Sequence, residues 1–359
     1  MDLPVNDQLH GSSGVIDRMR FGRFRPRILA PFIEKKLPPY PAGWYAIAFS
    51  CELRNERLLV RQVFGRDVVL FRTRAGAAAA LDAYCPHLGA HFGHGGRVEG
   101  ECIRCPFHGF LYDTRGVCVA TGYGSKPPPN ARTATWPLRE VNEMLLIYHD
   151  GSGAAPTWQV PALDWAQWSR PVRWTATLLA HPQETTENSV DLGHFAFVHG
   201  YRSVRMLRDV IVDGAYLSTA YAAKRPAPLI GRRSSRWDLD IEFETHIYGL
   251  GYSQVDVRVP AFDVRARLWV LPTPIDDDRT TLRLAVSADR CSGASHPWLQ
   301  RVPSCVRGAS IACGVLAGLV ADARRDFRIW EHKIHVDPPA LANGDGPIGR
   351  YRSWAAQFY

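Results

Sequence analysis

The pattern of hydrophobic and polar positions divides the chain into two strand-rich regions. In the first region, apolar residues alternate with polar ones in short runs separated by glycine-rich turns, which is typical of β-strands. The strands predicted there are residues 43–49, 58–63, 67–72, 81–84 and 143–148. A stretch of Gly, Ser, Ala and Pro at 151–156 then indicates a linker.

The pattern after the linker predicts more strands together with two helical segments. These strands are residues 172–179, 209–221, 236–248, 252–260, 262–271 and 279–287. Helices are predicted at 183–199 and at roughly 304–334. An antiparallel sheet combined with helices predicts an α+β fold for this region. The loop-like sequence at 224–236 is either a lid over a pocket or an ordinary surface loop.

Composition agrees with a two-domain protein that has sizeable cores. The chain has 359 residues, of which 46% are hydrophobic and 11% aromatic, so metals are not needed merely to hold a small fold together. The eight cysteines are scattered without the spacing of a disulfide framework, which indicates a reducing compartment. The N-terminus lacks a signal peptide, and the longest apolar run, Ile311–Ala321, is too short to span a bilayer. We therefore expect a soluble, cytoplasmic protein.

Two short Cys/His stretches carry the strongest chemical signal. Cys85-Pro-His87 and Cys105-Pro-Phe-His108 are separated by 17 residues, and each supplies one thiolate and one imidazole. Two Cys on one iron and two His on the other are the ligands of a Rieske [2Fe-2S] cluster. A structural Cys2His2 zinc site uses the same ligand types, but it groups its Cys in one turn and its His on a helix. The mixed pairs therefore favour the cluster.

A second metal site is indicated further along the chain. His194 and His199 lie five residues apart on the predicted helix and its exit, with Asp191 three residues before the first His. Two His and one carboxylate on one face of Fe(II) leave positions free for O2 and substrate. Taken alone, this spacing also fits ordinary core or surface histidines. Downstream of a cluster motif, it favours a mononuclear iron site.

These motifs together resemble a known family. The run Tyr84–Ala90, then Gly96-Arg-Val98, then Cys102–Gly109 is similar to the N-terminal domain of Rieske non-heme iron oxygenases, and most similar to the steroid-acting branch. That branch holds the oxygenase component of 3-ketosteroid 9α-hydroxylase and the cholesterol 7-desaturases. The basic lead-in and the linker divide the chain into a basic leader at 1–39, a Rieske domain at 40–150 and a catalytic domain at 157–359. For the catalytic domain, the resemblance implies a helix-grip fold with mononuclear iron.

The resemblance also assigns roles to individual residues. It implies that Asp326, in Asp326-Phe-Arg-Ile-Trp-Glu331, is the third iron ligand, with Asp322 one helical turn earlier as the alternative. It implies that Asp191 links His194 to the cluster ligand His108 of a neighbouring subunit, in a cyclic homotrimer. Asp191 alternatively only orients His194. Asn188 is expected near the iron.

Function and partners follow from the same resemblance. It implies a terminal monooxygenase component that uses O2 to hydroxylate, desaturate or demethylate a hydrophobic sterol or steroid. Another Rieske oxygenase, acting on an aromatic ring or natural product, keeps every ligand, and a non-enzymatic zinc-binding protein is the alternative of a different class. The chain has no GxGxxG after a strand, so electrons must come from a separate ferredoxin or NAD(P)H-dependent reductase.

Charge adds information about partners. The formal net charge is +8, yet no nucleic-acid module accompanies it, so an acidic electron donor is the better candidate and no nucleic-acid partner is expected. Residues 18–36 interleave basic and apolar side chains. This segment either contacts a membrane surface, where a hydrophobic substrate dissolves, or is a solvated lead-in to the first domain.

Overall fold

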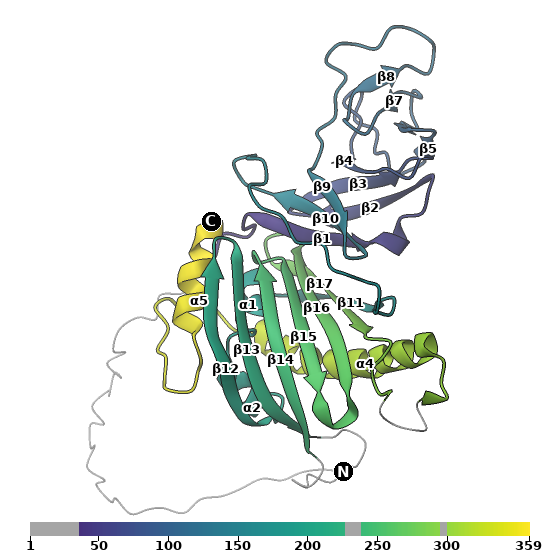
Figure 1. The fold of residues 1–359 in the computed structure, drawn as a ribbon. Coiled ribbons are helices and arrows are strands. Elements are labelled where there is room, and N and C mark those ends of the chain that lie inside the picture. The colour runs from purple at the N-terminus through teal and green to yellow at the C-terminus, as the bar shows by residue number, and fades with distance from the viewer. Residues whose placement is uncertain (1–35, 227–237, 295–299) are drawn as a thin grey trace, which may run out of the picture.

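The computed structural model describes residues 36–226, 238–294 and 300–359 (Figure 1). The N-terminal part is built from three small antiparallel sheets. One has the order β1 (Gly43–Phe49), β10 (Met144–His149), β9 (Leu138–Val141), and the second has the order β2 (Arg57–Val63), β3 (Arg66–Arg72), β4 (Ala78–Asp82). The third is a meander of β5 (Arg97–Glu99), β6 (Cys102–Arg104), β7 (Leu111–Tyr112) and β8 (Cys118–Ala120).

Strand β3 joins two cores in this part of the chain. Its side chains alternate between faces because the period of a strand is two residues. Val69 and Phe71 pack into the core that contains Cys85 and Cys105, whereas Val68 and Leu70 pack against β1 and β10 on the other face. The loops that carry both cysteines are therefore fixed on a continuous hydrophobic layer.

The C-terminal part is a seven-stranded antiparallel sheet with the order β11-β17-β16-β15-β14-β13-β12. Its strands are β11 (Val172–Leu179), β12 (Arg202–Asp213), β13 (Tyr216–Pro226), β14 (Asp238–Tyr248), β15 (Tyr252–Val259), β16 (Val264–Pro274) and β17 (Arg279–Ala288). Helix α4 (Ser304–Trp330) runs across one face of this sheet (Figure 1) and contacts β17, β11 and β16. Trp269 and Tyr252, on the other face, share a core with Trp44 and Tyr148 of the N-terminal part.

Among the described residues, shorter α-helices flank the C-terminal sheet. They are α1 (Pro182–Glu187), α2 (Leu192–Phe197) and α5 (Ile348–Ala355). Helix α1 is buried along its whole length and is held by α5: Arg352 makes a bidentate ion pair with Glu187, at 2.6 and 2.9 Å. Tyr351 also donates a hydrogen bond to the backbone carbonyl of Gln183, at 2.8 Å.

The α+β prediction is confirmed, with two local corrections. The predicted strand at 209–221 is wrong, because the chain turns at Gly214 (φ +53°) and forms the hairpin of β12 and β13. The predicted helix at 183–199 is two helices, because Asp191 adopts an extended conformation and caps α2. The hairpin has a recognisable signal, since Asp213-Gly214 is a common hairpin-turn sequence.

Some predictions lie outside the described residues or are not tested. The basic segment 18–36 and the loop 224–236 fall almost entirely outside them. The division at 1–39, 40–150 and 157–359 stays a prediction. Helix α4 is longer than the apolar run noted in the sequence, and by length and composition alone it is apolar enough to cross a membrane. In this fold, however, one side of α4 lies on the sheet and buries Asp326.

Candidate metal centres

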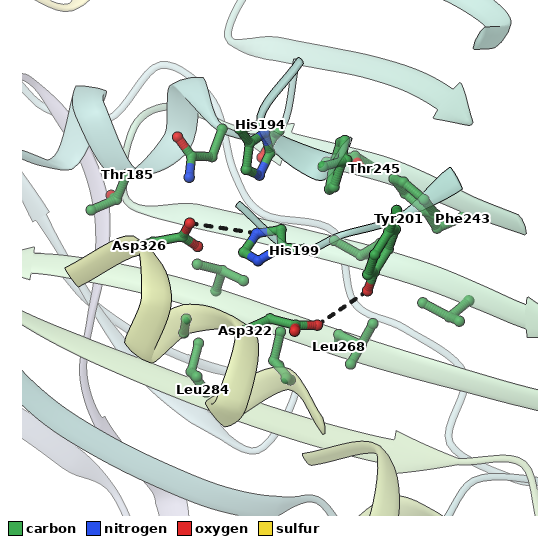
Figure 2. A pocket seen from close by; sticks show the side chains of 18 of the residues that line it. Thr185, His194, His199, Tyr201, Phe243, Thr245, Leu268, Leu284, Asp322 and Asp326 are labelled. Atoms are coloured by element: carbon green, nitrogen blue, oxygen red, sulfur yellow. Dashed lines mark hydrogen bonds and ion pairs between the residues drawn. The ribbon is translucent and has the colours of Figure 1, made fainter. Parts of the chain in front are cut away.

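Three predicted iron ligands converge on the face of the sheet that α4 covers. His194 lies in α2, His199 just after it, and Asp326 in the last third of α4. One donor atom from each lies within 4.8 Å of the others. The His199 Nε2 and Asp326 Oδ1 atoms are 3.4 Å apart (Figure 2). Residues separated by more than 120 positions in the sequence thus form one iron-donor group of two imidazoles and a carboxylate.

Asp191 determines how His194 is presented. Its carboxylate accepts a hydrogen bond from the His194 backbone N–H at 3.0 Å, which is the usual interaction of a helix N-cap. Its backbone carbonyl lies 2.5 Å from His194 Nδ1. Since Nδ1 is occupied as a donor to this carbonyl, the ring is fixed in the tautomer that leaves Nε2 available for a metal.

The electrostatics of the iron-donor group, His194, His199 and Asp326, fit a divalent cation. Burial, with Asp322 and Asp191 nearby, raises the pKa of Asp326 to about 8. Burial also lowers the pKa of His199 to about 3. His199 Nδ1 and Asp326 Oδ1 are buried and have no hydrogen-bond partner among the described residues. Neutral imidazoles and a carboxylate that lacks a counter-charge are the donor set that a metal ion would stabilise.

Asn188 and Trp330 support the carboxylate from the side. Asn188 directly follows α1 as its C-cap, and its side chain lies near enough to Asp326 to oppose part of the rise in the pKa of that carboxyl. Trp330 lies one helical turn after Asp326 and donates to Asn188 Oδ1 at 3.4 Å. The sequence predicts no role for Trp330, although its i+4 spacing from Asp326 places both on one helix face.

The three iron donors face a mostly apolar cavity. Side chains from five strands form its walls, among them Phe243, Leu268 and Leu284 (Figure 2). Polar groups are confined to the region around the three donors and to a second group near Tyr201. A cavity of this character binds a hydrophobic small molecule with a few polar contacts.

Asp322, the alternative ligand, lies in a different environment. Its carboxylate accepts from Tyr201 Oη at 3.1 Å and from Arg225 Nη2 at 2.7 Å. The group of converging donor atoms found among the described residues contains Asp326 and not Asp322. The geometry therefore favours Asp326 as the ligand. Tyr201 was not identified from the sequence, which carries no local signal for it. Arg225 falls in the loop-like segment 224–236 predicted from the sequence, but the structure places it at the end of strand β13.

The four predicted ligands of the [2Fe-2S] cluster lie on two loops that share the same backbone hydrogen-bond pattern. Each loop is closed by the same pair of backbone hydrogen bonds. The Cys N–H donates to the carbonyl five residues later, Ala90 or Phe110, and the Cys carbonyl accepts from the N–H of the glycine four residues later, Gly89 or Gly109. Gly89 and Gly109 take φ values of +76° and +67°, which glycine adopts at little cost. The two-fold repetition places both Cys inside and both His toward the surface.

The donor atoms of these loops fit a [2Fe-2S] cluster. The His87 and His108 rings lie 4.8 Å apart, and the Cys85 and Cys105 thiols are close enough to influence each other. His108 Nδ1 is buried with no partner among the described residues. Burial raises the pKa of Cys85, so its thiolate needs a cation, and the Tyr112 hydroxyl lies 3.2 Å from its sulfur.

Comparison with known families defines the class of this protein. Residues 43–137 match the Rieske [2Fe-2S] domain. Residues 147–359 match the 3-ketosteroid 9alpha-hydroxylase C-terminal domain, which accounts for more than half of the chain. The protein is therefore a Rieske oxygenase, an oxidoreductase that depends on an electron-transfer partner. Within this class, it belongs to the family defined by the 3-ketosteroid 9alpha-hydroxylase C-terminal domain.

Individual relatives agree with this placement. The chain is 32% identical to cholesterol 7-desaturase nvd of Bombyx mori over 338 residues, which cover 91% of this chain and 71% of the relative. It is 28% identical to a probable 3-ketosteroid-9-alpha-monooxygenase oxygenase component of Rhodococcus rhodochrous, over 91% of this chain and 82% of that protein. The predicted family, enzyme class and [2Fe-2S] cofactor are confirmed.

Solved structures share the fold. Pseudomonas putida NdmA aligns with a TM-score of 0.64 at 19% identity, over 88% of this chain and 89% of its own. Dicamba monooxygenase aligns with a TM-score of 0.61 at 20% identity, over 88% and 96%. One structure of the latter is described as containing non-heme iron, which agrees with the predicted second cofactor. The residues that bind each cofactor in this chain stay a prediction.

Proposed function

We propose that this protein is the terminal oxygenase component of a system that uses O2 to oxidise a C–H bond of a sterol or steroid. The observation that carries the proposal is the group of His194, His199 and Asp326 donors at the polar end of an apolar cavity. The relatives named for steroid and cholesterol oxidation support the substrate class. Hydroxylation, desaturation and demethylation are all within reach of this chemistry.

In this proposal, His194, His199 and Asp326 hold a mononuclear Fe(II), which activates O2 when bound. The surrounding residues have separate tasks. The Asp191 carbonyl fixes the ring of His194, and Asn188 orients the Asp326 carboxylate. The apolar walls exclude water and bind the hydrocarbon skeleton of the substrate. Cys85, His87, Cys105 and His108 hold the Rieske cluster, which supplies single electrons.

We further propose a cyclic homotrimer with head-to-tail contacts. Figure 1 shows that β5–β8, which lie beside the cluster loops, are at the opposite end of the molecule from α2. Exposed apolar side chains occur at both places: Phe197 of α2 is 94% exposed, and Leu88 and Phe107 of the cluster loops are 65% and 63% exposed. Packing these surfaces together would bring His108 of one copy to Asp191 of the next.

A separate donor, a ferredoxin or an NAD(P)H-dependent reductase, completes the system. The excess of basic residues favours an acidic donor, since opposite charges accelerate encounter. We propose a cytoplasmic location on the basis of the cysteine content. Contact of the basic leader with a membrane surface is an additional proposal that rests on residues 18–36 alone.

Metal analysis and product analysis test the proposal. Protein purified without oxygen should contain about three irons and about two inorganic sulfides per chain, with a red-brown colour that bleaches on reduction. A colourless protein without sulfide would eliminate the cluster. Turnover with a panel of sterols, ketosteroids and aromatic compounds should give oxidised product from the steroid group, whereas product from aromatic compounds alone would refute the substrate class.

A further inference from the structure

The cavity contains a second polar group that the metal site does not use. Arg225 of β13 donates through Nη2 to Asp322 Oδ2 at 2.7 Å and to the Gly318 carbonyl at 3.2 Å, both on α4. Tyr201 donates to the same Asp322 oxygen (Figure 2). All three of Tyr201, Arg225 and Asp322 line the cavity. An ion pair and a phenol thus lie in a cavity whose walls are mostly apolar.

Helix α4 is shaped to accommodate this ion pair. A Cβ atom at Gly318 would lie 2.9 Å from both terminal nitrogens of Arg225, so a larger residue there would displace the guanidinium. Glycine inside a helix costs about 1 kcal/mol relative to alanine. The Arg225 and Asp322 side chains are only 24% and 15% exposed, so both charges are largely desolvated. These features indicate a built polar site.

The arrangement leaves donors available for a ligand. A guanidinium has five N–H groups, and both hydrogen bonds that Arg225 makes among the described residues use Nη2. Because Arg225 lines the cavity, its remaining N–H groups are the candidate donors to a ligand oxygen there. The neighbouring Asp322 carboxylate offsets the charge of Arg225, so a ligand carboxylate would be repelled by Asp322 while a ketone or hydroxyl would not.

We propose that Arg225, paired with Asp322, binds an uncharged oxygen of the substrate, a ketone or a hydroxyl, and so determines which neutral ring compounds are accepted. This inference deepens the proposed function and rests on it. Asp322 precedes Asp326 by one helical turn, roughly 6 Å along α4. The anchored oxygen and the oxidised carbon therefore belong to the same end of the substrate.

Binding of matched ligands to the iron-loaded, assembled protein tests this inference. The ligands are a ketosteroid, the same skeleton without the ketone, and the same skeleton with a carboxylate in its place. Quenching of tryptophan fluorescence reports affinity, because Trp330 lines the cavity. Wild-type protein should bind the ketone about tenfold or more tighter than the deoxy compound, as expected for a hydrogen bond to a charged donor.

The variants separate recognition from folding. Arg225→Met should abolish the preference for the ketone. Asp322→Asn leaves the Arg225 charge uncompensated, so affinity for the carboxylate should rise about tenfold, a gain that a damaged fold would not produce. Lys224→Gln is the matched control, because Lys224 is adjacent on β13, pairs with Asp240 at 3.3 Å and does not line the cavity. It should behave as wild type.

Two results would overturn the inference while leaving the proposed function intact. They are an undiminished ketone preference in Arg225→Met, and an unchanged carboxylate affinity in Asp322→Asn. If wild-type protein binds none of the three steroids and yields no oxidised steroid, the proposed function itself fails together with the inference. Cluster absorbance and iron content of each variant establish that the protein is folded and loaded when binding is measured.

Discussion

The pH dependence of folding gives direct access to the buried carboxyl group of Asp326. Burial raises its pKa to about 8 in the metal-free protein, whereas in the unfolded chain this group loses its proton near its ordinary value of 3.8. Between these values the folded state holds one more proton than the unfolded state. The free energy of unfolding therefore falls by about 1.4 kcal/mol per pH unit as the pH rises.

His199 acts in the opposite direction at lower pH. Its pKa falls from 6.5 to about 3 on folding, so between these values the unfolded state holds the additional proton and stability rises with pH. The two slopes offset each other from about pH 4 to about pH 6.5. Of these two groups, only Asp326 still titrates from about pH 6.5 to about pH 8, and its contribution to the stability of the metal-free protein falls by about 2 kcal/mol over this range.

Asp326→Asn removes this titrating group and keeps the size of the side chain. Its stability relative to wild type should therefore increase by about 2 kcal/mol between pH 6.5 and pH 8. The measurement uses protein that keeps its [2Fe-2S] cluster but has lost the mononuclear iron to a chelator. Urea unfolding of this protein, followed by tryptophan fluorescence, measures the difference. Asp240→Asn, which alters an exposed carboxylate of β14, is the control and should run parallel to wild type.

Ferrous iron should stabilise wild-type protein relative to Asp326→Asn, the opposite of the effect of raising the pH without metal. Wild-type protein should gain stability when Fe(II) is added without oxygen, since metal binding to the folded state alone shifts the equilibrium. Asp326→Asn should gain little. Parallel pH profiles for wild type and Asp326→Asn, or equal stabilisation of both by Fe(II), would refute the assignment of Asp326 as a buried carboxylate that the metal stabilises.

Four further outcomes are expected from single substitutions. His194→Ala should lower iron from about three to about two per chain and abolish turnover while the cluster spectrum stays; loss of colour would show that the sites were confused. Asp322→Ala should keep nearly full iron content by metal analysis, and loss of the third iron would make Asp322 a ligand. Asp191→Ala should keep both metals yet reduce turnover by about tenfold or more, and wild-type turnover would contradict its role. Phe197→Glu should convert the oligomer to monomers in light scattering, and an intact trimer would exclude α2 from the interface.

The chemistry of this protein could be predicted from local sequence more fully than its fold. Both Cys/His pairs are short motifs whose ligands come from one loop each, so their spacing alone indicates a Rieske cluster. The third ligand of the iron site could not be found from local spacing, because Asp326 lies more than 120 residues after His199 and only tertiary packing brings them together. Spacing left Asp326 and Asp322 as alternatives that the sheet and α4 distinguish.

The errors in the predicted fold have identifiable causes. The region 202–213 carries three arginines, and its half-buried side chains alternate with exposed ones, so its apolar signal as a strand is weak. The break between α1 and α2 was missed because Asp191 was interpreted as a ligand-relay residue rather than as an N-cap. Arg225 and Tyr201 meet Asp322 from distant elements, and no periodicity in the sequence predicts such contacts.

The contact between α1 and α5 has a consequence for biosynthesis. Helix α1, which contributes Thr185 to the wall of the cavity and ends at Asn188, is held by Tyr351 and Arg352. In a nascent chain emerging from the ribosome, helix α1 therefore cannot be held in place until residues some 165 positions later have left the exit tunnel. Until then, the emerging domain exposes an unfinished hydrophobic interior, and iron insertion is expected to wait for the completion of translation.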